Sequence, residues 1–128
     1  MDPFLSSVLR FVLDEDSRGV IWRAIRQHNR STSLPLNITR VGDEPDLPLG
    51  LEDPHILLWA ERENRIVISA DRKTMTAHLT AHLEAGHHLA GLFIVLPSAK
   101  TPAIVDFLAL AAYASAPEEW LDRVVFIR

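Results

Sequence analysis

Residues 66–71, with the sequence IVISAD, indicate the fold class of this chain. A short run of apolar, mostly β-branched side chains bounded by polar ones predicts a strand whose two faces are both buried. Two other runs have the same character, RFVL at 10–13 and LFIVL at 92–96. Strands that read as continuous apolar runs are typical of a parallel sheet covered by helices on both faces. We therefore expect a parallel sheet of this kind, with the first run and the run at 66–70 as the two central candidates.

The segments between these runs have helical spacing of their apolar residues. They predict helices over 19–29, 53–64, 73–86 and 102–116, and two further strands over 36–41 and 124–127. The proline- and acid-rich residues 42–50 indicate a loop. This β-α-β alternation predicts an α/β protein: a three-layer α/β/α sandwich with a mostly parallel five-stranded sheet, forming a single domain over residues 1–128.

The composition narrows the possible functions. The chain has 128 residues, of which 48% are hydrophobic, and it contains no cysteine, which excludes disulfides and thiolate metal sites. Its net charge of −4 argues against simple electrostatic binding of nucleic acid. The apolar stretches are shorter than a membrane span needs, and the N-terminus has no basic leader. We therefore expect a cytoplasmic protein that does not enter a membrane.

Acidic residues follow two of the central strands. Asp14 follows the first strand and Asp71 follows the strand at 66–70, while Asp53 opens a helix with Pro54. If the two strands are neighbours, their carboxylates meet at one edge of the sheet, where open α/β sheets bind ligands. Carboxylate oxygens are the ligands of Mg²⁺ and Mn²⁺. The pattern predicts a metal site. On the local signal alone, a helix cap is the commoner role for Asp53, and Asp71 could likewise cap the helix that follows it.

Further charged residues lie next to these three acids. Glu15, Asp16 and Glu52 are secondary candidates for holding the metal, and a solvated acidic turn is the alternative for the first two. Arg18, Arg72 and Lys73 are candidates for contacting substrate phosphates around the metal, with exposed loop positions as the alternative.

Three motifs in register resemble the PIN-like domains, relatives of the VapC toxin ribonucleases. They are Asp14-Glu15 after an apolar strand, the 52–60 segment EDPHILLWA, and the 66–71 strand with its final acid. The resemblance covers nearly the whole chain. It departs from the family at Arg72, Lys73 and Met75, where a second Asp and a Phe are common, and no acid follows the strand at 92–96.

The resemblance implies a PIN-like fold and a metal-dependent endoribonuclease that cleaves RNA. It makes Asp14, Asp53 and Asp71 the catalytic residues and the ligands of Mg²⁺ or Mn²⁺. It also implies a homodimer and an antitoxin protein as partner. The alternative is a catalytically silent PIN-like module that acts by binding proteins.

Two other interpretations stay open. A flavodoxin-like receiver domain also has acids at strand ends. Asp71 would correspond loosely to its phosphoacceptor aspartate, and Lys100 to the lysine that lies further along its chain. The histidines at 78, 82, 87 and 88 could share a zinc ion, although partly exposed helix histidines are the simpler interpretation. The helix at 102–116 is either a layer helix or an interface with a second copy or an antitoxin.

Overall fold

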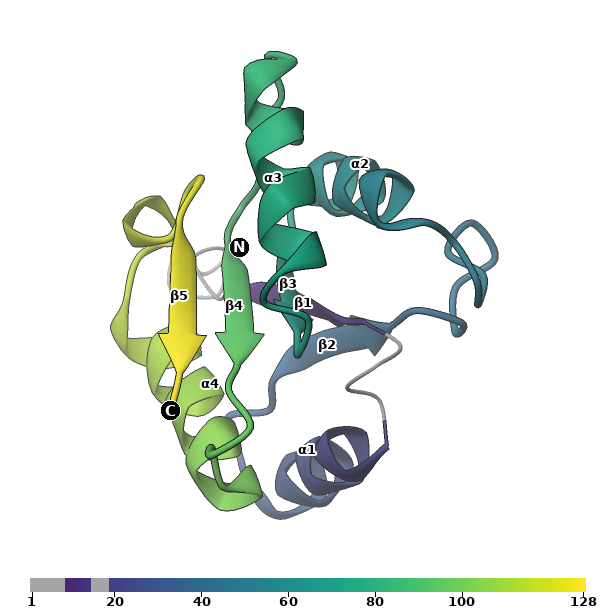
Figure 1. The fold of residues 1–128 in the computed structure, drawn as a ribbon. Helices are drawn as coiled ribbons and strands as arrows, with labels where there is room; N and C mark the ends of the chain where they lie inside the picture. Colours follow the sequence, from purple (N-terminus) through teal and green to yellow (C-terminus); the bar gives the residue numbers. More distant parts are fainter. Residues whose placement is uncertain (1–8, 15–18) are drawn as a thin grey trace, which may run out of the picture.

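The computed structural model describes residues 9–14 and 19–128 and contains one parallel five-stranded sheet (Figure 1). The strand order is β2-β1-β3-β4-β5, and every neighbouring pair is parallel. The strands are β1 (Arg10–Leu13), β2 (Asn37–Arg40), β3 (Ile66–Ser69), β4 (Leu92–Val95) and β5 (Val124–Ile127). The helices are α1 (Val20–Ser31), α2 (Asp53–Glu63), α3 (Thr74–Glu84) and α4 (Thr101–Ala114), with a 3₁₀ turn at Pro117–Glu119.

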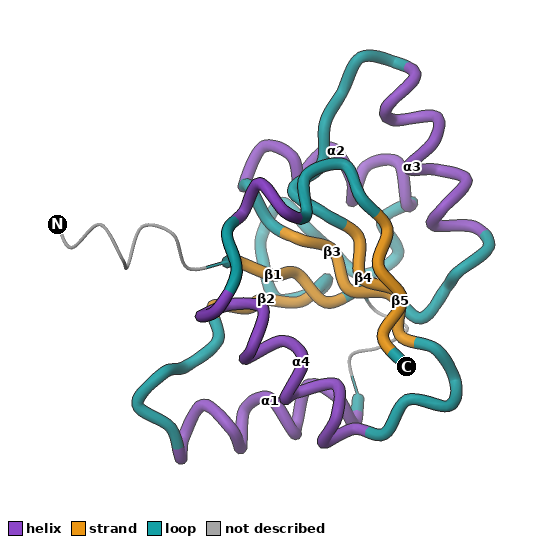
Figure 2. The backbone as a smooth tube through the Cα atoms, turned by 90° about the vertical axis from the view of Figure 1, so that its left-hand side faces the viewer, coloured by secondary structure: helices purple, strands orange, loops and turns teal. Residues whose placement is uncertain are grey.

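Helices cover both faces of the sheet, α1 and α4 on one and α2 and α3 on the other (Figure 2). Alternating side chains of β3 show how the two layers are packed. Ile66 and Ile68 belong to the core under α1 and α4, and Val67 belongs to the core under α2 and α3. All three are at most 2% exposed. The predicted three-layer α/β/α sandwich is confirmed, and the sheet is parallel throughout the described residues.

The start of α2 differs by one residue from the sequence prediction. The sequence predicts Asp53 as the helix cap, but Glu52 is the N-cap and Asp53 is the first helical residue, with Pro54 in the first turn. Proline suits this position because the first N–H groups of a helix have no partner within it. The carboxylate of Asp53 is also favourable here because the helix dipole is positive at its N-terminus.

In the part of the chain that the structure describes, none of the helices is both long enough and apolar enough to cross a bilayer.

Candidate functional site

The carboxyl ends of all five strands lie at one edge of the sheet, because the strands are parallel. The chain leaves β1 through α1 on one face and enters β3 through α2 on the other face. The direction of winding therefore reverses between β1 and β3. In doubly wound sheets of this strand order, ligands bind in the crevice beyond the strand ends at this switch point.

Asp14 lies at this switch point. It follows β1 directly, is only 4% exposed, and donates its backbone N–H to the Ile68 carbonyl of β3 at 2.9 Å. Since Leu13 pairs with Ile68, Asp14 lies beside the fully buried Ser69. The strands before Asp14 and Asp71 are therefore neighbours, which is the condition that the sequence analysis set for the metal site. Burying a carboxylate is costly, so such positions are often functional.

Asp71 lies two residues beyond the end of β3 and is tied to the start of α3. Its backbone N–H donates to Ser69 Oγ at 3.0 Å. Its Oδ1 accepts the backbone N–H groups of Lys73 at 3.2 Å and Thr74 at 2.9 Å. The N-cap of α3 is Lys73, two residues later, so Asp71 stabilises the turn that leads into α3 through Oδ1.

The topology brings all three predicted aspartates to the carboxyl edge. Asp14 and Asp71 follow adjacent strands, and Asp53 opens the helix that descends from the same edge. Within the described ranges, however, their carboxylates do not form a group spaced to share a metal ion directly; a different set of side chains does.

The secondary candidates divide into two groups. Glu15, Asp16 and Arg18 lie outside the described residues. Glu52 is exposed at the N-cap of α2, and Arg72 and Lys73 are exposed beside Asp71, just before α3.

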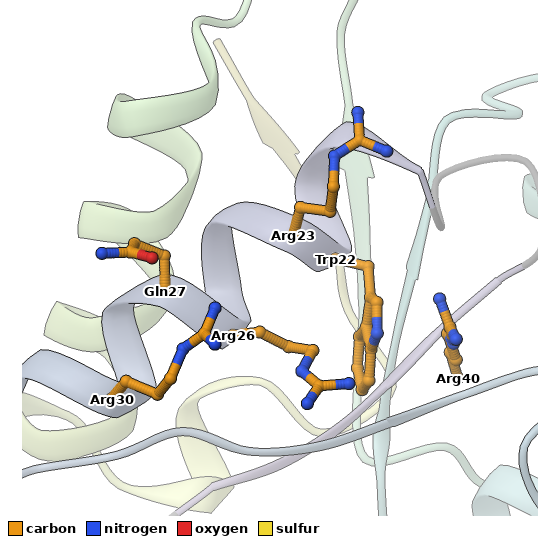
Figure 3. Close-up of a pocket in the computed structure, with 6 residues that line it drawn as sticks. All are labelled: Trp22, Arg23, Arg26, Gln27, Arg30 and Arg40. Atoms are coloured by element: carbon orange, nitrogen blue, oxygen red, sulfur yellow. The ribbon is translucent and has the colours of Figure 1, made fainter.

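An arginine-lined groove, which the sequence analysis missed, lies between α1 and β2. Four arginines line it, together with Trp22 and Gln27, and its volume is about 460 Å³ (Figure 3). Arg23, Arg26 and Arg30 are exposed on one side of α1, and Arg40 is the last residue of β2. Because β2 pairs with β1, Arg40 lies opposite Leu13, one residue before Asp14. The groove therefore reaches the carboxyl edge.

The Trp22 ring forms one wall of this groove. The Arg40 guanidinium lies 4.6 Å from the ring centroid, and its Nε also contacts Asp43 Oδ2 at 2.5 Å. In Figure 3 the Arg26 side chain extends toward the same ring. An aromatic ring beside several guanidinium groups is a surface that can stack a base and contact phosphates. The sequence signal for this groove was the i, i+3, i+7 spacing of the three α1 arginines, which places them on one side of the helix.

A cluster of one glutamate and two histidines could hold a metal ion. Their ligand atoms, on Glu61, His82 and His87, all lie within 4.8 Å of one another. Glu61 Oε1 lies 3.3 Å from His82 Nε2 and 3.0 Å from His87 Nδ1. The sequence analysis named the two histidines but missed Glu61, which comes from α2.

Hydrogen bonds at this cluster also set the charge of its groups. The backbone N–H of His88 donates to Glu61 Oε2 at 3.0 Å and holds the pKa of that carboxyl below its ordinary value, and the neighbouring imidazoles of His82 and His87 lower it further against the effect of burial. His88 Nδ1 lies 2.7 Å from Asp122 Oδ2, and this hydrogen bond raises the pKa of His88. Glu61 is thus held as a carboxylate facing the two imidazoles.

The chain is a doubly wound, parallel α/β protein with a buried acid at its switch point and a basic groove at the same edge. Comparison of the chain with protein-family models, with curated proteins and with solved structures finds no match.

Proposed function

We propose that this protein is a metal-dependent endoribonuclease of the PIN-like type. Asp14, Asp53 and Asp71 would hold Mg²⁺ or Mn²⁺ at the carboxyl edge, where RNA phosphodiesters are cleaved. The observation that carries the proposal is the position of Asp14, a buried acid at the switch point beside the strand that leads to Asp71. Ligands of doubly wound sheets bind at this point.

The donor atoms at this edge suit a hard cation. Carboxylate oxygens prefer Mg²⁺ and Mn²⁺, and Mg²⁺ commonly keeps several water ligands while one or two carboxylates bind it. Direct contact with all three aspartates is therefore unnecessary, which agrees with their wider spacing. Asp71 can keep its backbone hydrogen bonds through Oδ1 and offer Oδ2 to the ion or its water. When bound, such an ion lowers the pKa of a water ligand and neutralises charge on the cleaving phosphodiester.

The arginine groove supports RNA as the substrate. Arg40 brings positive charge to within one strand of Asp14, and the α1 arginines extend this charge away from the edge. Guanidinium groups bind phosphates well because their N–H groups match the phosphate oxygens in pairs. An RNA strand along α1 would therefore place one phosphate near Asp14. Arg72 and Lys73 follow β3, so they lie on the side of Asp14 that faces away from Arg40.

The resemblance to VapC-type toxins extends the proposal to partners and location. An antitoxin protein would restrain the enzyme, a homodimer would be its assembly, and the cytoplasm would be its compartment. The silent protein-binding module is the alternative, and it differs by predicting neither a metal response nor RNA cleavage.

The receiver-domain interpretation has one observation in its favour. The strand order β2-β1-β3-β4-β5 is the flavodoxin-like order, which receiver domains share. Against it, Asp71 Oδ1 already accepts two backbone N–H groups, and Lys100 lies beyond β4, just before α4. A receiver domain would incorporate a phosphoryl group from acetyl phosphate at Asp71, whereas the nuclease would not.

Substitution of Asp14 by asparagine tests the proposal. The wild-type chain should cleave single-stranded RNA in Mg²⁺ or Mn²⁺ and melt at a higher temperature with the ion. Asp14→Asn should lose both effects, because it removes the charge at the switch point while keeping the size of the side chain. Asp106→Asn is the matched control, since Asp106 is exposed on α4. Equal cleavage by Asp14→Asn and the wild type would overturn the proposed role, and so would a wild type with neither response.

A further inference from the structure

The Glu61, His82 and His87 cluster lies at the opposite edge of the sheet from Asp14. Helices α2 and α3 both begin at the carboxyl edge and run back along the sheet, and Glu61 and His82 lie near their C-terminal ends. His87 follows in the connection from α3 to β4. The cluster is therefore independent of the proposed nuclease site.

We propose that these three side chains form a binding site for Zn²⁺ or a similar divalent transition-metal ion, with a fourth position open to an adjacent cavity. Two imidazole nitrogens and one carboxylate oxygen are the donors that Zn²⁺ accepts in three-ligand sites, whereas Mg²⁺ prefers oxygen alone. The predicted carboxyl-edge site and this site thus select different metals.

The distances within the cluster match a tetrahedral ion. With metal–ligand bonds of about 2.0–2.1 Å, neighbouring ligands of a tetrahedron are about 3.3 Å apart. The separations of Glu61 Oε1 from His82 Nε2 and His87 Nδ1, 3.3 and 3.0 Å, are close to that edge length. The third separation is at most 4.8 Å, and His87 is 45% exposed, so its ring can turn inward without disturbing the core.

Neighbouring groups already orient the ligands. The His88 backbone N–H holds Glu61 Oε2, which leaves Oε1 directed at the two imidazoles. The His82 and His87 rings are stacked face to face, with their centroids 4.9 Å apart and an interplanar angle of 25°. Outer-shell hydrogen bonds of this kind fix ligand orientation in metal sites.

Binding of the ion requires a change of tautomer at His82. Its Nε2 lies 2.8 Å from the His88 carbonyl oxygen, so in the neutral imidazole the single N–H is on Nε2 and donates to that oxygen. To bind the metal through Nε2, the ring gives up this hydrogen to solvent and takes one up at Nδ1, so the Nε2 lone pair is freed without net release of a proton. The ring then binds as the neutral imidazole that metal sites require.

The fourth position is provided by a cavity of about 210 Å³. His82 and His87 line this cavity together with His78, which is one turn earlier on α3, and with apolar side chains that include Leu58. Three protein ligands with one open position are typical of zinc sites that keep a water. The cavity, which His78 also lines, leaves room for that water.

Metal titration of the untagged chain tests the site. Chelator-treated protein without a histidine tag should bind one Zn²⁺, followed by calorimetry, and should give the visible absorption of four-coordinate Co²⁺. His87→Ala and Glu61→Gln should each weaken Zn²⁺ binding by at least about tenfold, the size of effect that outer-shell changes alone produce. Both substituted side chains are partly exposed, so the fold should tolerate them.

Two control variants show whether Zn²⁺ binding depends on this cluster alone. His55→Ala removes an exposed histidine of α2 outside the cluster and should leave Zn²⁺ binding unchanged. Asp14→Asn should also bind Zn²⁺ normally, so failure of the nuclease proposal would not affect this result. Absence of Zn²⁺ and Co²⁺ binding, or equal binding by the wild type, His87→Ala and Glu61→Gln, would overturn the inference.

Discussion

Replacement of Arg26 by glutamine should weaken the binding of single-stranded RNA and reduce its dependence on salt. Among the described residues, Arg23, Arg26 and Arg30 have no ion pair, whereas Arg40 is paired with Asp43 at 2.5 Å. Three guanidinium groups can therefore neutralise RNA phosphates. Each such contact releases counterions from the nucleic acid, so the number of contacts can be measured from the salt dependence.

The expected magnitudes follow from these three contacts. For single strands the logarithm of the binding constant falls with the logarithm of salt concentration by about 0.7 per contact, which gives a slope of about −2.1 for the wild type. A fourfold increase in salt should then weaken binding about 18-fold. With Arg26→Gln two contacts remain, the slope becomes about −1.4, and the same increase weakens binding only about sevenfold.

Fluorescence anisotropy with a labelled oligouridine, in chelator to prevent cleavage, measures both slopes. Arg123→Gln is the matched control, because it makes the same charge change at an exposed residue just before β5, at the opposite edge of the sheet from Arg40. Its slope should equal that of the wild type. If Arg26→Gln and Arg123→Gln give the same slope, the groove between α1 and β2 does not hold the RNA backbone.

Three further predictions concern stability. Leu108→Ala should destabilise the fold by about 2–5 kcal/mol in urea unfolding, because Leu108 is fully buried between α4 and the sheet and its loss leaves a cavity; a loss below about 1 kcal/mol would contradict this packing. Gly91→Ala should cost about 1–3 kcal/mol by the same measurement, since Gly91 has φ of 155° and an added Cβ would lie 3.1 Å from the Trp120 carbonyl oxygen; unchanged stability would show that the two segments can separate freely. Asp122→Asn should destabilise the protein in a pH-dependent way. Burial raises the pKa of Asp122, but the Leu89 N–H at 2.8 Å and a neighbouring imidazole lower it more, so the pKa lies below the ordinary 3.8. A carboxyl whose pKa is lower in the folded state stabilises that state above the unfolded pKa of 3.8, and this stabilisation is lost as the pH falls through the folded pKa. The difference in stability between wild type and variant should therefore shrink below pH 3.8. A difference that grows on acidification would refute the assignment.

Local sequence signals are sufficient to predict the layers of the fold. Continuous apolar runs such as IVIS at 66–69 indicate the central strands, because only strands covered on both faces can bury every side chain. The adjacency of β1 and β3, a condition of the predicted site, is confirmed by the pairing of Leu13 with Ile68. The predicted cap position of α2 is wrong by one residue, since Glu52 and Asp53 are both acids that suit a helix start.

The groove and the histidine cluster could not be predicted from local sequence patterns, because each depends on how two elements pack in the tertiary structure. Arg40 joins the α1 arginines only because β2 pairs with β1, and strand order is not encoded in the period of a single strand. Glu61 meets His82 only because α2 packs against α3, which brings together residues that are 21 positions apart. In both cases the sequence identified one part of the site, and the packing of two elements supplied the other.

The net charge of −4 does not conflict with RNA binding, although composition alone argued against it. Four of the 13 basic residues line one groove, so the surface charge is far from uniform. At physiological ionic strength charges are screened beyond about 8 Å, so a phosphate in the groove interacts mainly with those arginines and little with acids elsewhere. An overall basic variant made by neutralising distant acids should therefore bind RNA no more tightly at that salt, whereas loss of a single groove arginine should weaken binding measurably.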